Sequence, residues 1–286
     1  MRFSSEQLIT AKKNFGHMLG AGGCGAVYRV LKGSSNQQIE VQFMADLGTI
    51  GRIHHVNLYE FMEKGSLDGL LFRNTEKISF DMLHEIALGT AKGIGYLHEE
   101  SQQRMVHYDI KPRNILLDEN LSPKVADFGL AKLCNMDGRG RGTPDYAAPE
   151  RWMPFPVTHK CDVYSYGMLL FEIVGRRRNL ELNLESQEKF LKWVQEKFEE
   201  KEIDEIVKIC EWEDNGEKVE RMVKVALRCV QHRPEMRPSM SSVVKMLGGG
   251  VQIKNTTEES YKGSYVGNLK ESVHSIYIFN YGKCIL

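Results

Sequence analysis

The sequence lacks an excess of charge of either sign, because 38 lysines and arginines balance 38 aspartates and glutamates. A chain without a net charge does not attract nucleic acid or an anionic membrane surface as a whole. We therefore expect no nucleic-acid partner, and we expect any partner to be recognised by a local surface.

Paired cysteines and long apolar runs are also missing. The six cysteines lie far apart, with no C-x-x-C pair and no histidine at metal-ligand spacing, which indicates reduced thiols in the cytosol. The most apolar run, residues 163–174, is too short to span a bilayer and contains Glu172. Neither Arg2 nor Cys284 fits a lipidation motif. We expect a cytoplasmic chain with no transmembrane segment.

The apolar residues that are present predict mainly helices. Apolar side chains recur at helical spacing in residues 39–50, 83–97 and 222–230. Residues 163–174 are apolar nearly all round, as in a helix at the centre of a large domain. After residue 248 the chain is polar, without a clear period or motif.

The first motif is the Gly-rich segment L-G-A-G-G-C-G-A-V-Y at residues 19–28. Gly20, Gly22 and Gly25 let backbone amides approach phosphate oxygens. A dinucleotide-binding turn leads from a strand into a helix, whereas this motif ends in strand-like residues at Val27. The pattern favours the nucleotide loop of a protein kinase. A Gly-rich turn without a ligand is the alternative from this motif alone.

The second motif is an ordered set that is highly specific for protein kinases. It consists of H-Y-D-I-K-P-R-N at residues 107–114, D-F-G at residues 127–129 and A-P-E at residues 148–150. Phosphoryl transfer spreads negative charge over oxygens, so a site needs metal ions, carboxylates that hold them, and a positioned base. This set supplies all of these.

The general kinase template gives each of these residues a role. Asp109 accepts the proton of the substrate hydroxyl, and Lys111 neutralises charge on the moving phosphoryl group. Asn114 and Asp127 hold two magnesium ions. The lysine two positions after the aspartate is typical of serine/threonine kinases. Asp109 and Asp127 could instead be solvated turn residues, but that alternative does not explain their order with the other motifs.

Four further segments resemble plant receptor-like kinases of the rust-resistance type. They are R-F-S-S-E-Q-L at residues 2–8, G-T-I-G-R-I-H-H-V-N-L at 48–58, E-F-M-E-K-G-S-L at 60–67 and P-F-P-V-T-H-K-C-D-V-Y at 154–164. The resemblance extends to about residue 247. It implies an α+β, two-lobed protein-kinase-like fold, with a truncated β-containing small lobe and a helical large lobe.

The resemblance also implies a division of the chain and a set of partners. The expected parts are a juxtamembrane-like segment at 1–18, the truncated small lobe and hinge at 19–62, the large lobe at 63–248, and a tail of unknown function at 249–286. ATP and Mg²⁺ are the implied cofactors. A protein with an acceptor serine or threonine is the implied substrate. A receptor or co-receptor kinase is an implied partner, and such partners would bring the chain to the cytoplasmic face of the plasma membrane.

Roles for single residues follow from the same resemblance. Residues that would contact ATP are Gly20, Gly22, Gly25, Val27, Glu60, Met62 and Leu116, with Leu116 under the adenine ring and the hinge at residues 59–62. Residues with a structural role would be His107, Phe128, Gly129, Glu150, Asp162 and Arg237. Of these, Asp162 would anchor the catalytic loop, and Glu150 would pair with Arg237 between distant helices. Thr143 would line the substrate groove.

The small lobe departs from the kinase pattern. A kinase carries a strand with Val-Ala-X-Lys, whose lysine holds the nucleotide phosphates and pairs with a helix glutamate. Here the chain runs from Tyr28 directly into Arg29, so that either Arg29 takes the lysine position or no residue does, and Asp46 stands where the glutamate is expected. Two further strands are missing after Leu58. We expect a poorly ordered small lobe, weakened nucleotide affinity and impaired catalysis.

The activation segment departs from the pattern as well. Tyr108 replaces the arginine that in many kinases receives an activation-loop phosphate, and residues 130–142 contain no serine or threonine. Two functions stay open. The complete catalytic set favours an active serine/threonine kinase, whereas the missing lysine favours a pseudokinase that acts as a binding module. The deletions could also reflect an imperfect gene model.

Overall fold

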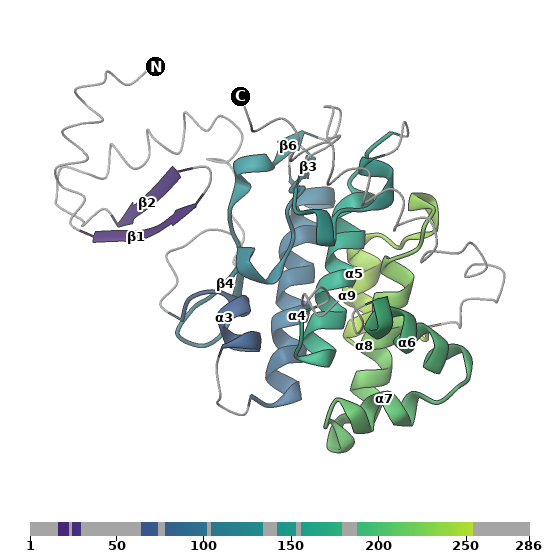
Figure 1. Ribbon diagram of the computed structural model, residues 1–286. Coiled ribbons are helices and arrows are strands. Elements are labelled where there is room, and N and C mark those ends of the chain that lie inside the picture. Colours follow the sequence, from purple (N-terminus) through teal and green to yellow (C-terminus); the bar gives the residue numbers. More distant parts are fainter. Residues whose placement is uncertain are drawn as a thin grey trace, which may run out of the picture.

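The structure of the chain is a computed structural model that describes residues 17–22, 25–29, 64–73, 78–101, 104–133, 142–152, 156–178 and 188–253. Helices dominate these residues, and the strands are short (Figure 1). The helix predicted at residues 39–50 and the hinge predicted at residues 59–62 lie outside the described residues. Asp46 and most of the tail lie outside them too.

The Gly-rich motif forms a hairpin of two antiparallel strands. β1, His17–Gly22, pairs with β2, Gly25–Arg29, and the register is irregular between Met18 and Gly20. Figure 1 shows this hairpin at the side of the molecule where α3 lies. An isolated pair of strands is marginally stable in water. This hairpin is the described part of the predicted small lobe.

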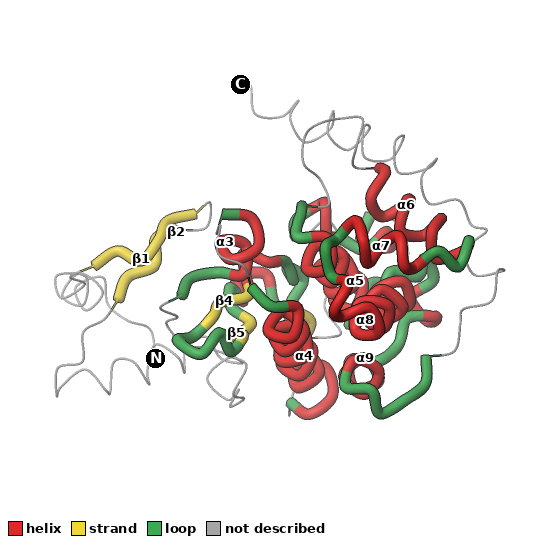
Figure 2. The backbone as a smooth tube through the Cα atoms, turned by 90° about the horizontal axis from the view of Figure 1, so that it is seen from below, coloured by secondary structure: helices red, strands yellow, loops and turns green. Residues whose placement is uncertain are grey.

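Seven α-helices account for about half of the remaining described residues. They are α3 (Leu67–Phe72), α4 (Phe80–Gly95), α5 (Lys160–Gly175), α6 (Glu188–Glu199), α7 (Ile203–Ile209), α8 (Gly216–Cys229) and α9 (Met240–Leu247). A π-helical turn, Tyr96–Glu100, extends α4. α4, α5, α8 and α9 pack against one another and form the body of the helical part (Figure 2).

Helix α5 lies at the centre of this body. Every residue from Cys161 to Val174 is buried, which confirms the interpretation of residues 163–174 as a central helix. Gly167 lets α8 come close, because a Cβ atom there would lie 2.7 Å from Cβ of Cys229 and 2.8 Å from Cγ1 of Val230. The helix is therefore a fixed support for the loops that surround its N-terminal end.

The two other predicted apolar stripes face the same core. The stripe of α4 is completely buried, and so are the apolar residues of α8. α4 begins after Ser79, whose hydroxyl accepts a hydrogen bond from the backbone N–H of Met82 at 3.3 Å. α9 begins in the same way after Ser239, which accepts from Ser242.

Four short strands flank the H-Y-D-I-K-P-R-N and D-F-G motifs at one edge of the helical body. β3 (Met105–Val106) pairs with β6 (Lys132–Leu133), and β4 (Ile115–Leu117) pairs with β5 (Pro123–Val125). The H-Y-D-I-K-P-R-N segment connects β3 to β4, and the D-F-G segment connects β5 to β6. The two pairings therefore bring both motifs to the same place.

Candidate active site

Asp162, in the first turn of α5, anchors the catalytic loop. Its Oδ2 accepts hydrogen bonds from the backbone N–H of His107 at 2.7 Å and from Nε2 of His98 at 3.0 Å, and its Oδ1 accepts from the N–H of Tyr108 at 2.8 Å. Burial by itself would raise the pKa of Asp162, but the hydrogen bond and charge of His98 and the contact with His107 lower it below the ordinary value. The buried carboxylate therefore stays ionised and holds two consecutive peptide groups.

His107 links the catalytic loop to the D-F-G segment. Its Nε2–H donates to the carbonyl oxygen of Ala126 at 3.0 Å, and its Nδ1 accepts from the N–H of Asp109 at 3.2 Å. Burial lowers the pKa of His107, so the ring is neutral and uses both nitrogens in this way. Its ring also contacts the ring of Phe128, with centroids 4.8 Å apart. The histidine thus fixes the position of Asp109 relative to Phe128.

Asp109 is buried and accepts hydrogen bonds at both carboxylate oxygens. Oδ1 accepts from the hydroxyl of Thr143 at 2.7 Å and from the backbone N–H of Thr143 at 3.1 Å. Oδ2 accepts from Nζ of Lys111 at 2.7 Å and from Nδ2 of Asn114 at 3.0 Å. Burial raises the pKa of Asp109, but the hydrogen bonds and charge of Lys111, with those of Thr143 and Asn114, lower it below its usual value. The group is an ionised, oriented carboxylate.

Asn114 and Asp127 adjoin each other through the backbone. The N–H of Ala126, the residue before Asp127, donates to the carbonyl oxygen of Asn114 at 2.9 Å. The side-chain amide of Asn114 donates to Asp109, which directs its amide oxygen elsewhere, and Asp127 is exposed. Asp127 also has a left-handed backbone, with φ of 61°. Oxygen ligands of this kind suit Mg²⁺, so these two residues fit the metal that the motif implies.

The residues predicted to contact ATP are described only in part. Gly20 and Gly22 lie on β1, and Gly25 and Val27 lie on β2. Leu116 lies on β4, where it is half-buried and forms a bridge with Ser66. Glu60 and Met62 lie outside the described residues. The adenine contacts stay a prediction.

The buried ion pair between Glu150 and Arg237 is present. Nη1 and Nη2 of Arg237 lie 2.6 Å and 2.9 Å from the two carboxylate oxygens of Glu150, and both side chains are almost completely buried. The pair joins elements that are distant in the sequence, as expected, but these are short 3₁₀ helices and not α-helices. Glu150 lies in the 3₁₀ helix Pro149–Arg151, and Arg237 directly follows the 3₁₀ helix Pro234–Met236. Gly129, the last residue of the D-F-G segment, lies in the 3₁₀ turn Phe128–Leu130.

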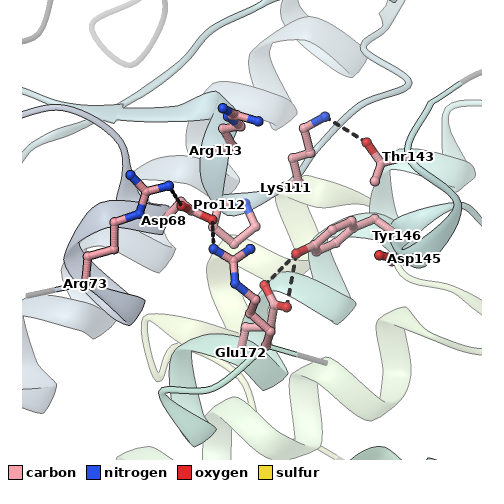
Figure 3. Close-up of a pocket in the computed structure, with 10 residues that line it drawn as sticks. Asp68, Arg73, Lys111, Pro112, Arg113, Thr143, Asp145, Tyr146 and Glu172 are labelled. Carbon is pink, nitrogen blue, oxygen red and sulfur yellow. Dashed lines mark hydrogen bonds and ion pairs between the residues drawn. The ribbon is translucent and has the colours of Figure 1, made fainter. Parts of the chain in front are cut away.

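A pocket of about 240 Å³ opens beside the catalytic loop, with Lys111 and Thr143 in its wall. Figure 3 shows Lys111 pointing to Thr143, and Tyr146 pointing to Glu172 of α5. The hydroxyl of Tyr146 donates to both oxygens of Glu172, at 3.0 and 2.9 Å, and burial and the charge of Glu172 raise the pKa of Tyr146. Thr143 therefore lies between Asp109 and a polar pocket that could hold part of a peptide.

Sequence reasoning missed three residues of this region. His98 binds Asp162, which lies 64 positions later in the chain, and no local feature of the sequence indicated this contact. Tyr146 contacts Glu172, and the acidic residue in the otherwise apolar segment 163–174 was an available signal. Arg151 is buried although arginine is usually exposed, so nothing in the sequence indicated its burial.

Comparison with known proteins identifies the family. A profile of the family described as protein tyrosine and serine/threonine kinase matches residues 47–247. The chain belongs to this family. The match begins after the Gly-rich hairpin and covers the catalytic loop, the D-F-G and A-P-E segments and helices α3 to α9 of this kinase domain.

Plant receptor kinases are close relatives of this kinase domain. A G-type lectin S-receptor-like serine/threonine-protein kinase of Arabidopsis thaliana is 40% identical over 96% of the chain, and one of Oryza sativa subsp. indica is 37% identical over 93%. The PR5-like receptor kinase of Arabidopsis thaliana is 35% identical over 88%. The prediction of a plant receptor-like serine/threonine kinase domain is thereby confirmed. The chain spans 38%, 37% and 44% of the length of these relatives.

The alignments also bear on the predicted deletions. The alignment with the first relative extends over 315 residues, which is 29 more than the 286 residues of this chain. That relative therefore has residues with no counterpart here. Within the described residues, no helix is long and apolar enough to cross a membrane.

Proposed function

We propose that this kinase domain transfers the γ-phosphoryl group of ATP to serine or threonine hydroxyls of proteins. The observation that supports this best is the set of contacts around Asp109, in which Lys111, Asn114 and Thr143 all bind one ionised carboxylate. A base of this kind must be ionised and held in place before the substrate arrives. The oriented carboxylate meets both needs.

The transfer step assigns a role to each of these groups. The substrate oxygen forms a bond to the γ-phosphorus while the bond from phosphorus to the ADP oxygen breaks, and the hydroxyl proton passes to Asp109. Lys111, 2.7 Å from Asp109, supplies positive charge beside the oxygens that gain negative charge. Asn114 and Asp127 would hold Mg²⁺, which supplies further positive charge when bound.

The cellular setting is also part of this proposal. The relatives are named as receptor-like kinases, which supports a receptor or co-receptor kinase as a partner and a place at the cytoplasmic face of the plasma membrane. A pseudokinase that acts as a binding module is the second candidate. It is supported by the absence of a Val-Ala-X-Lys segment from the sequence.

A transfer assay with labelled ATP separates the two candidates. The purified chain is incubated with a generic serine/threonine peptide, with and without magnesium, beside Asp109→Asn and Asp127→Ala. We expect transfer that needs magnesium and falls at least about a hundredfold in Asp109→Asn, because the variant lacks the base. Transfer that is absent from the parent chain, or equal in the parent and Asp109→Asn, would contradict the enzyme and leave the binding module.

A further inference from the structure

Arg151 is a buried cation next to the catalytic loop. It ends the 3₁₀ turn Pro149–Arg151 directly after the A-P-E motif, and only 1% of its surface is exposed. Among the described residues, no carboxylate lies within ion-pair distance of it, and its Nε and Nη2 atoms have no hydrogen-bond partner. A buried charge without an ion pair is costly to the fold. A specific contact is therefore expected to offset this cost.

That contact is with Tyr108, the residue before Asp109. Nη1 of Arg151 donates to the backbone carbonyl oxygen of Tyr108 at 2.7 Å. The guanidinium carbon also lies 5.1 Å from the centroid of the Tyr108 ring, within the range of a cation–π interaction. The arginine thus binds both the backbone and the side chain of one residue.

Tyr108 needs such support because its backbone is strained. Its φ is 68°, in the left-handed region that bulky residues rarely adopt, at a cost of about 1–3 kcal/mol. Its N–H is held by Asp162 at 2.8 Å, and its carbonyl is held by Arg151. The peptide groups on both sides of this strained residue are therefore held by different elements. The second of these groups links Tyr108 to Asp109.

Gly142, in the activation segment, packs closely against Arg151 and the backbone of Tyr108. Its φ is 92°, and a Cβ atom there would clash with the carbonyl oxygen of Tyr108 and lie 2.5 and 2.8 Å from Nη1 and Nη2 of Arg151. The next residue, Thr143, binds the carboxylate of Asp109. The packing of Gly142 on Arg151 therefore also determines where Thr143 meets Asp109.

We propose that Arg151 is a positioning residue that holds Asp109 in its catalytic orientation through the strained backbone of Tyr108. This inference rests on the proposed kinase function. The position of Tyr108 is where many kinases carry the arginine that receives an activation-loop phosphate. In this chain an arginine from the A-P-E turn joins the catalytic loop to the activation segment, and the contact needs no phosphate.

The test compares Arg151→Met, which keeps an unbranched apolar stem but removes the donors and the charge, with Arg151→Lys and with Val223→Ala. Val223 is buried in α8 and has no contact with the catalytic loop in the described interactions, so its truncation lowers stability alone. Three quantities are measured on the full chain. They are the kcat and KM for ATP, and the hydrogen-exchange rate of the Tyr108 and Asp109 amides divided by that of amides in the middle of α5.

We expect Arg151→Met to raise this exchange ratio about tenfold or more and to lower kcat by up to about a hundredfold, with KM for ATP little changed, because a small displacement of the base affects the chemical step. Arg151→Lys should recover part of both effects, since an ammonium group can still donate to the carbonyl. Val223→Ala should leave the ratio unchanged. An unchanged ratio in Arg151→Met, or the same increase in Val223→Ala, would overturn the proposal.

A second variant guards against a failure of Arg151→Met to fold. Gly142→Ala keeps Arg151 but places a methyl group against its contact with Tyr108, so it should raise the same exchange ratio. If the parent chain transfers no phosphate, the proposed enzyme fails, but the exchange ratio still decides whether Arg151 holds the catalytic loop.

Discussion

Single residues in this site work through shared hydrogen-bond partners. The hydroxyl of Thr143 donates to Asp109 and accepts from Lys111, both at 2.7 Å, so one side chain keeps the base and the cation at a fixed separation. Asp162 does the same for the backbone, since its two oxygens hold His107 and Tyr108. Each of these two residues therefore has an effect beyond its own contacts.

Replacing Thr143 tests the first of these arrangements. Thr143→Val keeps the shape but loses both side-chain hydrogen bonds, and each bond to a charged group is worth about 1.5–3 kcal/mol. We expect kcat to fall about tenfold or more. The hydrogen bond from Thr143 lowers the pKa of Asp109, so its loss should raise that pKa and move the acid limb of the activity profile to higher pH. Thr143→Ser, which keeps the hydroxyl, is the control. An unaltered pH profile in Thr143→Val would show that the hydroxyl does not act on Asp109.

Replacing Asp162 tests the anchor. Asp162→Asn leaves one acceptor oxygen for three donors, and we expect a loss of about 3 kcal/mol or more in the free energy of unfolding at neutral pH. The pKa of Asp162 is lowered in the folded chain, so its contribution is full above the ordinary value of about 3.9 and is lost as the pH falls through the lower folded value. Urea unfolding should therefore show a difference between parent and variant that shrinks below about pH 4. The exposed Asp204→Asn should differ little at any pH. A constant difference down to pH 2 would contradict this account.

At the scale of the elements, close packing of α5 on α8 organises the helical body. Gly167→Ala would place a Cβ atom 2.7 Å from Cβ of Cys229, and we expect a loss of about 1–3 kcal/mol through overpacking. Gly69→Ala in α3 is the matched control, because a Cβ atom there meets nothing within 4 Å. That variant should be neutral or gain up to about 1 kcal/mol from helix propensity. Thermal unfolding measures both, and equal midpoints for the two variants would mean that α5 and α8 can separate without cost.

The sequence predicted elements better than contacts. The burial of α5 followed from a segment that is apolar nearly all round, and the buried faces of α4 and α8 followed from helical spacing, because both signals are local. The contact between His98 and Asp162 joins residues 64 positions apart and has no local signal. The burial of Arg151 was hidden for a different reason, since a charged residue is exposed by default.

For the catalytic residues, too, the sequence predicted which residues take part better than it predicted all of their contacts. The motifs named Asp109, Lys111 and Asn114, and the structure places both Lys111 and Asn114 in contact with Asp109. The motifs could not show that Thr143 completes this contact, because 34 residues separate it from Asp109 and the activation segment must fold back to close the gap. Roles that depend on bound ATP and magnesium stay predictions.

At the scale of the whole molecule, the two predicted lobes differ in how complete they are. The helical body carries an intact catalytic loop, its anchor and the Glu150–Arg237 ion pair. The described part of the small lobe is a two-stranded hairpin, and the chain has fewer residues than its alignment with the first relative spans. If this chain is an enzyme, its rate should therefore be limited by how it holds the nucleotide and not by the base.

Repair of the small lobe tests that conclusion. We expect insertion of the missing strands with their Val-Ala-X-Lys lysine, combined with Asp46→Glu, to raise kcat/KM at least about a hundredfold, because a charge-assisted contact of about 1.5–3 kcal/mol is restored and each 1.36 kcal/mol is about tenfold in rate. Asp46→Glu alone should change little, since a helix carboxylate has no lysine to orient, so the two repairs should be strongly non-additive. The measurement is kcat/KM for a generic serine/threonine peptide across the parent, each single repair and the double repair, with Asp109→Asn added to the double repair as the control that removes the base. A parent that already matches the double repair would mean that Arg29 or another basic residue takes the place of the lysine, and that this kinase domain holds ATP in a different way from the general template.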